Sequence, residues 1–450
     1  MRLQIADPAD HPHLGALPFR TPLAQWEMPH MHGVLGLHRH VVRLVELGEE
    51  GRRTSYVVKE LPDHLAEREY RLLRQLVEDR LPTVIAVAVV TERSPDRDGL
   101  LITRHLDYSL PYRTLLSGRG LSIPYLGERL LDALVGLLVR LHLAGFFWGD
   151  CSLSNTLFRR DAGALQAYVV DVETSARYPQ LSDGQRKLDL DIATENVAGG
   201  LLDLQAAGRL VGDIDPWAIA EDLETQYRTL WDEVTGVEEF DTTELWRVEE
   251  RVRRIRELGF DVGEMEVISD AEGGHVRIVP RVVESGYHQD RLYALTGLWA
   301  GENQARRLLD DIHRFGAELR ARTGASPPEN IVAVRWLDQR FEPTIAAIPS
   351  SMIGKLQAAE IYHQLLEHRW FESERQQRDV SMDEALATYI PNVLAPAPDE
   401  HLELGTPTGE LFLPDLERPT PARPGPVADE GSAPGPSRPG PRPESRAWDT

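Results

Sequence analysis

The sequence has a single cysteine, no long uncharged apolar run and no apolar segment at its start. The lone Cys151 excludes an intramolecular disulfide framework and fits a reducing compartment. The longest apolar stretch, residues 126–143, contains charged residues such as Glu128 and Asp132, so it is too short and too charged to span a bilayer. The opening MRLQIADPADHPHLG has no signal core, and we expect a cytoplasmic protein.

Positive charge is also scarce. The 49 basic residues face 72 acidic ones, which gives a net charge of -23 and argues against a nucleic-acid partner or an anionic membrane. Lysine occurs only as Lys59, Lys187 and Lys355, so nearly every cation is an arginine. The length of 450 residues and the 42% hydrophobic content are ordinary for a soluble protein with two or more domains.

The most informative stretch covers residues 126–173. An apolar helical run leads into the polar loop FFWGDCSLSNTLF, and the strand-like segments NTLF and YVVDV flank a turn. The loop carries Asp150 and, five residues later, Asn155, while Asp171 lies at the end of the second strand. This spacing suits phosphoryl transfer, because one carboxylate can orient the acceptor hydroxyl while an amide and a second carboxylate hold Mg²⁺. A chance spacing in a polar loop is the alternative.

The stretch resembles the catalytic loop and metal-binding strand of the protein-kinase-like superfamily. It is most similar to the branch of lipopolysaccharide kinases and aminoglycoside phosphotransferases, whose loop reads HGDxxxxN. The resemblance implies a catalytic base at Asp150 and metal ligands at Asn155 and Asp171, the last in the role of the DFG aspartate. Trp148 stands where the family has His, and Val172-Glu173 stands where protein kinases have Phe-Gly. Because that His holds the loop by hydrogen bonding, its loss bears on rate more than on nucleotide binding.

The region before this stretch reads as a small sheet. Short apolar or β-branched segments predict its strands, at 34–37, 41–47, 55–59, 83–91 and 99–105. The third segment ends in VVKE, and in the kinase-like fold the third strand carries a Lys that contacts the nucleotide phosphates. The resemblance therefore implies a nucleotide-binding role for Lys59, against the alternative of an ordinary edge-strand cation.

Residues 63–78 follow a helical pattern in which Glu69 shares the apolar face of Leu65, Leu72 and Leu73. An acid on a buried stripe needs a partner, and Lys59 is the expected one. This pair would reproduce the strand-Lys to helix-Glu ion pair of an active kinase lobe. A solvated helix flank is the alternative, which the spacing disfavours.

Other motifs are weaker. Residues 105–116 should form the hinge behind the adenine, and residues 33–40 are the nearest candidate for a glycine loop, although they lack G-x-G-x-x-G. His30, His32, His38 and His40 form two H-x-H pairs, and because alternate residues of a strand face the same way, a zinc site on a hairpin is geometrically possible. Cys151 is expected to be a small buried hydrophobe.

The predicted fold class is α+β, with a two-lobed protein-kinase-like fold, a helix-rich mixed domain and a disordered tail. The expected boundaries are 1–26 for an irregular segment, 27–105 for the small lobe, 106–214 for the helical lobe, 215–396 for the mixed domain and 397–450 for the Pro/Gly-rich tail. A helix over 186–208 carries Asp189 and Asp191, and either could brace the backbone of the catalytic loop.

The C-terminal half contains no further specific phosphate or metal motif. The expected helices are 217–235, 243–258, 291–322, 331–348, 351–374 and 382–393, with a hairpin at 260–268 and 275–283. ENQARRLLDDI and HRWFESERQQRDVSMDEALATYIPNVL resemble an uncharacterised bacterial family that accompanies lipopolysaccharide-kinase-like lobes. Two acid-x-x-His pairs, Asp310 with His313 and Glu360 with His363, could suggest a di-metal site, but helix-surface charge is the favoured interpretation.

Three hypotheses about function follow. The first is an ATP- and Mg²⁺-dependent phosphotransferase acting on a hydroxyl of an unidentified acceptor, possibly a sugar or glycan. The second is a nucleotide-binding pseudokinase whose C-terminal domain docks a protein partner, which Trp148 and the missing glycine pattern favour. The third, a helical scaffold without nucleotide, would require the candidate residues to coincide by accident.

Overall fold

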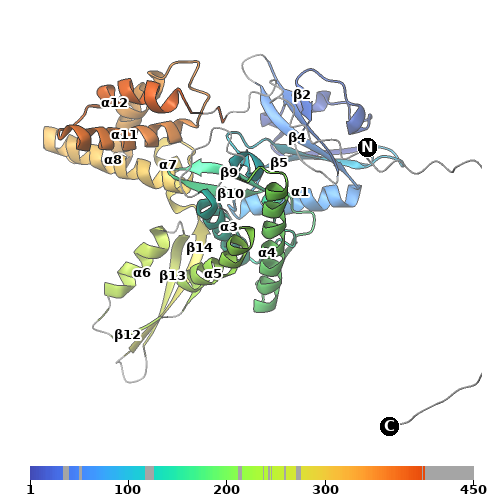
Figure 1. The fold of residues 1–450 in the computed structure, drawn as a ribbon, viewed down its shortest axis with the longest axis horizontal. Helices are drawn as coiled ribbons and strands as arrows, with labels where there is room; N and C mark the ends of the chain where they lie inside the picture. The colour runs from blue at the N-terminus through green and yellow to red at the C-terminus, as the bar shows by residue number, and fades with distance from the viewer. Residues whose placement is uncertain are drawn as a thin grey trace, which may run out of the picture. The chain divides into compact units, whose positions relative to one another are not determined.

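The computed structural model describes most of the first 400 residues (Figure 1). The described ranges are 1–33, 40–49, 53–116, 126–210, 215–236, 238–241, 244, 246–257, 260–269, 275–397 and 399–400. The chain divides into two compact units, Met1–Gly405 and Thr406–Thr450, and every described residue lies in the first. Apart from residues 397, 399 and 400, the tail predicted to be disordered lies outside the described residues.

The N-terminal part is a six-stranded antiparallel sheet with the order β1-β5-β6-β4-β3-β2. Its strands are β1 (Arg2–Ile5), β2 (Met31–Gly33), β3 (Val41–Leu47), β4 (Thr54–Leu61), β5 (Ala86–Thr91) and β6 (Gly99–Arg104). Helix α1 (Asp63–Glu78) follows β4 and packs along β5 and β6, as Figure 1 shows. The predicted strand at 41–47 and helix at 63–78 are confirmed, whereas the predicted strand at 34–37 lies outside the described residues.

The expectation of an irregular segment over residues 1–26 is wrong at its start. Strand β1 pairs residues 2–5 with residues 91–88 of β5 and so forms one edge of the sheet. The following short 3₁₀ turns bury Leu14, Leu23 and Trp26 against the sheet. A four-residue strand has almost no local signal, because its partner lies more than 80 residues away in the sequence.

The second part is built around α3 (Leu126–Leu143), which is buried on most of its surface. The other helices here are α2 (Tyr112–Leu116) and α4 (Asp183–Ala206), and the strands are β7 (Leu110–Pro111), β8 (Phe146–Phe147), β9 (Thr156–Asp161), β10 (Ala164–Val169) and β11 (Ala176–Arg177). The predicted hairpin is confirmed, since β9 and β10 pair from residue 156 to residue 169. One apolar core extends from α1 of the small sheet through α3 to α4, so the two lobes share their packing.

The C-terminal part is mixed, as predicted. Its strands are β12 (Glu238–Asp241), β13 (Phe260–Ser269) and β14 (His275–Ser285), and its helices are α5 (Pro216–Thr235), α6 (Trp246–Glu257), α7 (Tyr287–Thr296), α8 (Glu302–Thr323), α9 (Glu329–Trp336), α10 (Glu342–Ala346), α11 (Ala358–Gln376) and α12 (Met382–Tyr389). The predicted hairpin is β13 and β14, and β12 adds a third strand beside β14. None of the described helices combines the length and the apolar composition that crossing a bilayer requires.

Three of the predicted helices are shorter or interrupted. The single helix expected over 291–322 is two helices, because Gly297 ends α7 with a φ of 74° and α8 begins only after Gly301. The helix expected over 331–348 contains a π-helical segment at Leu337–Phe341 between α9 and α10. The helix expected over 351–374 starts at Ala358. Periodicity located the apolar faces in each case, but the local cap and turn geometry set the ends.

The hairpin of the second part is tied to the C-terminal helices by a buried carboxylate. Asp161, at the end of β9, is 2% exposed and accepts hydrogen bonds from the backbone nitrogens of Asn303 at 3.0 Å and Gln304 at 2.8 Å, at the start of α8. Gly301 lies so close that a Cβ there would come within 2.2 Å of the Asp161 carboxylate. Burial raises the pKa of Asp161 to about 6, and the two backbone hydrogen bonds oppose that shift.

We predict that Asp161→Ala lowers the free energy of unfolding by about 2 kcal/mol, because it leaves buried backbone donors at the helix start without partners. Asp183→Ala is the control, since Asp183 also lies in a first helical turn but its side chain is 96% exposed; we expect an effect below about 0.5 kcal/mol there. Urea unfolding of both variants measures the difference. An equal loss of unfolding free energy in the two variants would show that the Asp161 side chain does not stabilise the start of α8.

Candidate active site

Lys59 and Glu69 form an ion pair between β4 and α1. The Lys59 Nζ lies 3.1 Å from Glu69 Oε2, and the two side chains are 13% and 1% exposed. Glu69 lies on the buried face of α1 with Ala66, Tyr70 and Leu73, so its carboxylate reaches the sheet rather than solvent. The helical spacing predicts this pairing, and the structure brings the two side chains together. Their role in nucleotide binding stays a prediction.

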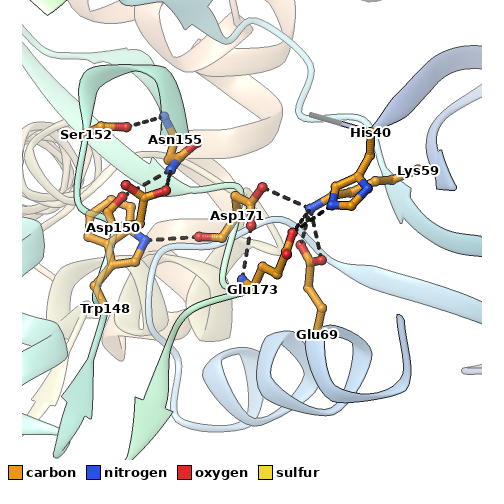
Figure 2. Close-up of polar contacts among 9 residues, drawn as sticks. All are labelled: His40, Lys59, Glu69, Trp148, Asp150, Ser152, Asn155, Asp171 and Glu173. Carbon is orange, nitrogen blue, oxygen red and sulfur yellow. Dashed lines mark hydrogen bonds and ion pairs between the residues drawn. The ribbon is translucent and has the colours of Figure 1, made fainter. Parts of the chain in front are cut away.

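The same ammonium group joins the small sheet to the segment after β10. Lys59 Nζ donates to Asp171 Oδ2 at 2.9 Å and lies 3.7 Å from Glu173 Oε2 (Figure 2). Burial disfavours the charged ammonium, but the carboxylates of Glu69 and Asp171 outweigh it and raise the pKa of Lys59. Burial, together with the nearby Asp171 charge, raises the pKa of Glu69 to about 7. The Lys59 ammonium therefore lies among the carboxylates of Glu69, Asp171 and Glu173.

Asp150 lies in the loop before β9. The side chains of Asn155, in the same loop, and of Asn196, on α4, each donate a hydrogen bond to one of its carboxylate oxygens. Asn155 Nδ2 donates to Asp150 Oδ2 at 2.9 Å (Figure 2). Asn196 Nδ2 donates to Asp150 Oδ1 at 3.2 Å. Ser152 caps the short 3₁₀ turn Leu153–Asn155 by accepting the Asn155 backbone N–H, which fixes the start of β9. Burial raises the pKa of Asp150, and the hydrogen bond from Asn155 opposes the shift. The carboxylate is thus oriented by two amides.

Asp189 braces the backbone of this loop. Its Oδ2 accepts the Trp148 backbone N–H at 2.7 Å, and its Oδ1 accepts the Gly149 N–H at 2.8 Å. The Asp189 side chain is fully buried, whereas Asp191 pairs with Lys187 on the surface of α4. Of the two aspartates that the sequence left open, Asp189 is the one that holds the loop.

Trp148 stands where the HGDxxxxN pattern has His, and the Trp148 side chain also makes a hydrogen bond. The indole is buried, and its Nε1–H donates to the backbone carbonyl of Asp171 at 3.0 Å (Figure 2). The Trp148 carbonyl in turn accepts from the hydroxyl groups of Ser175 at 2.8 Å and Thr174 at 3.2 Å. Trp148 therefore ties the loop of Asp150 directly to the segment of Asp171.

Sequence reasoning missed two residues that support the site. Arg68, next to Glu69 on α1, donates to the backbone carbonyls of Glu173 and Ser175 and so holds the segment after Asp171. Asn196 contacts Asp150 and also donates to the Cys151 carbonyl at 3.0 Å. The signal for Asn196 was available, because a residue seven positions after Asp189 lies on the same helical face. Arg68 had no such signal, since its partners are distant backbone atoms.

The structure describes only part of the candidate glycine loop and of the histidine pairs, whereas it describes Cys151. Residues 34–39 of the candidate glycine loop lie outside the described residues, but His40 is described and its Nε2 lies 2.9 Å from Glu173 Oε2. Cys151 is fully buried, as expected, and burial raises the pKa of its thiol. His38 also lies outside the described part, so the zinc hypothesis is not tested in full.

The two acid-x-x-His pairs differ from each other. His313 is 54% exposed and contacts Glu329, which agrees with the expected surface charge. The expectation is wrong for Glu360 and His363, which are only 3% and 2% exposed. Glu360 is buried because it accepts hydrogen bonds from Ala162 N–H in the hairpin turn and from the Gln304 side chain. Glu360 therefore fastens α11 to the hairpin.

The residues present fit a magnesium ion bound together with phosphates. Asn155 Nδ2 is committed to Asp150, so the amide oxygen is the atom left to act as a ligand, and the Asp171 side chain is 35% exposed. In the described part of the chain no three His, Cys, Asp or Glu side chains already form a metal-binding group. Magnesium commonly uses only one or two protein oxygens and completes its shell with phosphates and water, so this donor set is sufficient.

Comparison with known proteins agrees with this geometry. Residues 41–193 match the family model of the lipopolysaccharide kinase (Kdo/WaaP) family. Residues 229–394 match DUF4032, a domain of unknown function. The family match confirms the predicted class, a kinase-like phosphotransferase.

Solved structures are similar at low sequence identity. WaaP in complex with acyl carrier protein shares 18% identity with a TM-score of 0.34, and the alignment covers 57% of this chain and 99% of that chain. The yeast RNA Pol II CTD kinase CTDK-1 complex shares 15% identity with a TM-score of 0.25, over 35% of this chain and 50% of that chain. No curated protein matches the sequence.

The titration of Glu69 gives a testable pH dependence. Its pKa rises from 4.5 to about 7 in the folded protein, so the folded state binds a proton more tightly than the unfolded state. Stability from this group is complete below pH 4.5 and is lost as the pH rises toward 7. We predict that the stability advantage of wild type over Glu69→Gln shrinks between about pH 5 and about pH 8, measured by urea unfolding. An advantage that grows with pH would contradict the assignment.

Proposed function

We propose that this protein transfers a phosphoryl group from Mg²⁺-bound ATP to a hydroxyl group. Two neighbouring hydrogen-bonded groups carry the proposal. Lys59 of β4 joins Glu69 of α1 to Asp171 after β10, and Asn155 joins Asp150 within the catalytic loop. Trp148, in the same loop, ties the second group to the first through the Asp171 carbonyl. We propose residues 106–214 as the helical lobe and residues 215–396 as the C-terminal domain, as predicted, and we extend the small lobe from 27–105 to include β1, which pairs with β5.

Each residue has a distinct proposed role. Lys59 contacts the nucleotide phosphates, and Glu69 holds the ammonium in place from α1. Asn155 and Asp171 hold magnesium, which when bound neutralises negative charge on the phosphates. Asp150 accepts the proton of the acceptor hydroxyl as the oxygen bonds to the γ-phosphorus and the bond from that phosphorus to ADP breaks. The raised pKa of the Asp150 carboxyl supports its role as a proton acceptor.

The family match supports a sugar or glycan hydroxyl as the acceptor, because the matched family is one of lipopolysaccharide kinases. A cytoplasmic location agrees with ATP as the donor. The pseudokinase remains the competing proposal, with the C-terminal domain docking a protein partner. Trp148 no longer favours it, because the indole N–H makes a hydrogen bond to the Asp171 carbonyl and so keeps the loop tied.

We predict that Mg²⁺ and ATP together raise the melting temperature. A ligand that binds only the folded state stabilises it by about 2.7 kcal/mol when its free concentration is about 100 times Kd. Lys59→Ala should remove most of this gain. Lys187→Ala is the matched control, because Lys187 is a surface lysine whose partner is Asp191 on the same helix. No shift for wild type at millimolar ATP would overturn the nucleotide assignment.

We also predict that Asp150→Asn and Asp171→Asn differ. Asp150→Asn should lower phosphoryl transfer or slow ATP hydrolysis by about 100- to 10,000-fold while ATP affinity changes little, since Asp150 faces the acceptor. Asp171→Asn should weaken Mg²⁺-dependent nucleotide binding as well as turnover, because it removes a charged metal ligand.

Asp191→Asn serves as the control for both changes, because Asp191 is an exposed aspartate on α4. Turnover and nucleotide titrations with Mg²⁺ separate the two roles. Equal hydrolysis by wild type and Asp150→Asn, with contaminating activity excluded, would remove Asp150 from the catalytic role, whereas ATP binding without any turnover in wild type would favour the pseudokinase.

A further inference from the structure

A buried hydrogen-bond network extends from the catalytic loop to α5. Asp189 accepts the backbone N–H groups of Trp148 and Gly149, and its Oδ2 also lies 3.1 Å from His142 Nε2 on α3. The second ring nitrogen of His142, Nδ1, lies 2.6 Å from the hydroxyl oxygen of Tyr227 on α5. The imidazole is therefore held at both nitrogens, from α4 on one side and α5 on the other.

The two partners of His142 set the direction of these bonds. The Asp189 carboxylate can only accept, so the hydrogen between it and the ring belongs to His142 Nε2. The other ring nitrogen, Nδ1, is then free to accept the hydrogen of the Tyr227 hydroxyl. Burial raises the pKa of Tyr227, so the phenol keeps this hydrogen. The ring of Tyr227 stacks on Trp231, and the Arg186 guanidinium lies 4.1 Å over the Trp231 ring.

The hydroxyl of Tyr227 thereby selects one tautomer of His142. A neutral imidazole has one donor and one acceptor nitrogen. With Nδ1 accepting from Tyr227, Nε2 carries the proton and donates to the buried Asp189 carboxylate. In the other tautomer a lone pair would face that carboxylate, which is repulsive. The hydroxyl therefore keeps a donor directed at Asp189, the residue that fixes the loop backbone.

We propose that Tyr227 is a positioning residue for the reaction, acting through His142 and Asp189 on the backbone of residues 148–150. The kinetic part of this proposal rests on the proposed function. Tyr227 lies between the two matched ranges, 41–193 and 229–394, so neither family description includes it. Helix α5 then serves the catalytic loop although it follows the kinase-family segment in the sequence.

The first experiment needs no activity. Hydrogen exchange of the backbone amides at residues 146–151, measured by mass spectrometry, compares wild type with Tyr227→Phe. Loss of the hydroxyl should speed exchange of the Trp148 and Gly149 amides by about fivefold, the factor for one buried hydrogen bond. Tyr362→Phe is the matched control, because Tyr362 is a buried tyrosine whose hydroxyl donates to the buried Asp311 at 2.9 Å, far from this loop in sequence. Unchanged exchange in Tyr227→Phe would overturn the proposal.

A second variant, His142→Gln, tests whether Tyr227 acts on the loop through His142. Gln at position 142 can still donate to Asp189 through its amide, so Tyr227→Phe should have a smaller effect on exchange in a His142→Gln background. Fully additive effects would show that Tyr227 does not act through His142, and would overturn the proposal.

Steady-state kinetics separate a positioning role of Tyr227 from an effect on overall stability. Tyr227→Phe should lower kcat about five- to tenfold with an unchanged KM for ATP, whereas Tyr362→Phe should lower only the melting temperature. Faster exchange in Tyr227→Phe with an unchanged kcat would overturn the positioning role. If wild type shows neither transfer nor hydrolysis, the proposed function fails, and the exchange data alone decide whether Tyr227 holds the loop.

Discussion

The structure of the site depends on one buried ammonium group. Lys59 contacts Glu69 of α1 and Asp171 after β10, so the sheet, its helix and the segment of the second lobe meet at a single charge. Buried carboxylates need such a partner, since burial without one would neutralise them. Burial, and after it the charge of Asp171, raise the pKa of Glu69 to about 7 although Lys59 opposes the shift.

Three other buried carboxylates, those of Asp189, Asp161 and Asp311, are also paired, but with uncharged donors. Asp189 is paired with backbone N–H groups of the catalytic loop, and Asp161 with those at the start of α8. Asp311 accepts from the indole of Trp336 and the hydroxyl of Tyr362 inside the C-terminal core. Each acid therefore fixes the position of a distant segment, because its partners come from elsewhere in the sequence.

The features that sequence could predict are those with a local signal. The helix of Glu69 has a clear apolar face, and the spacing from Asp150 to Asn155 is set within one loop. Strand β1 and Arg68 were not predictable, because their partners are far away in the sequence and carry no pattern of their own. The choice of Asp189 over Asp191 also required coordinates, since the two differ only in the direction in which α4 presents them.

The boundaries of the matched families do not coincide with the boundaries of the physical structure. The kinase-family range ends at residue 193, within α4, yet Asn196 three residues later contacts Asp150. The turn of the hairpin that follows Asn155 is held by Glu360, which belongs to the domain of unknown function. Buried polar contacts of this kind cannot be cut without leaving unpaired groups. The C-terminal half is therefore part of the framework that supports the candidate active site, rather than a separate module attached to it.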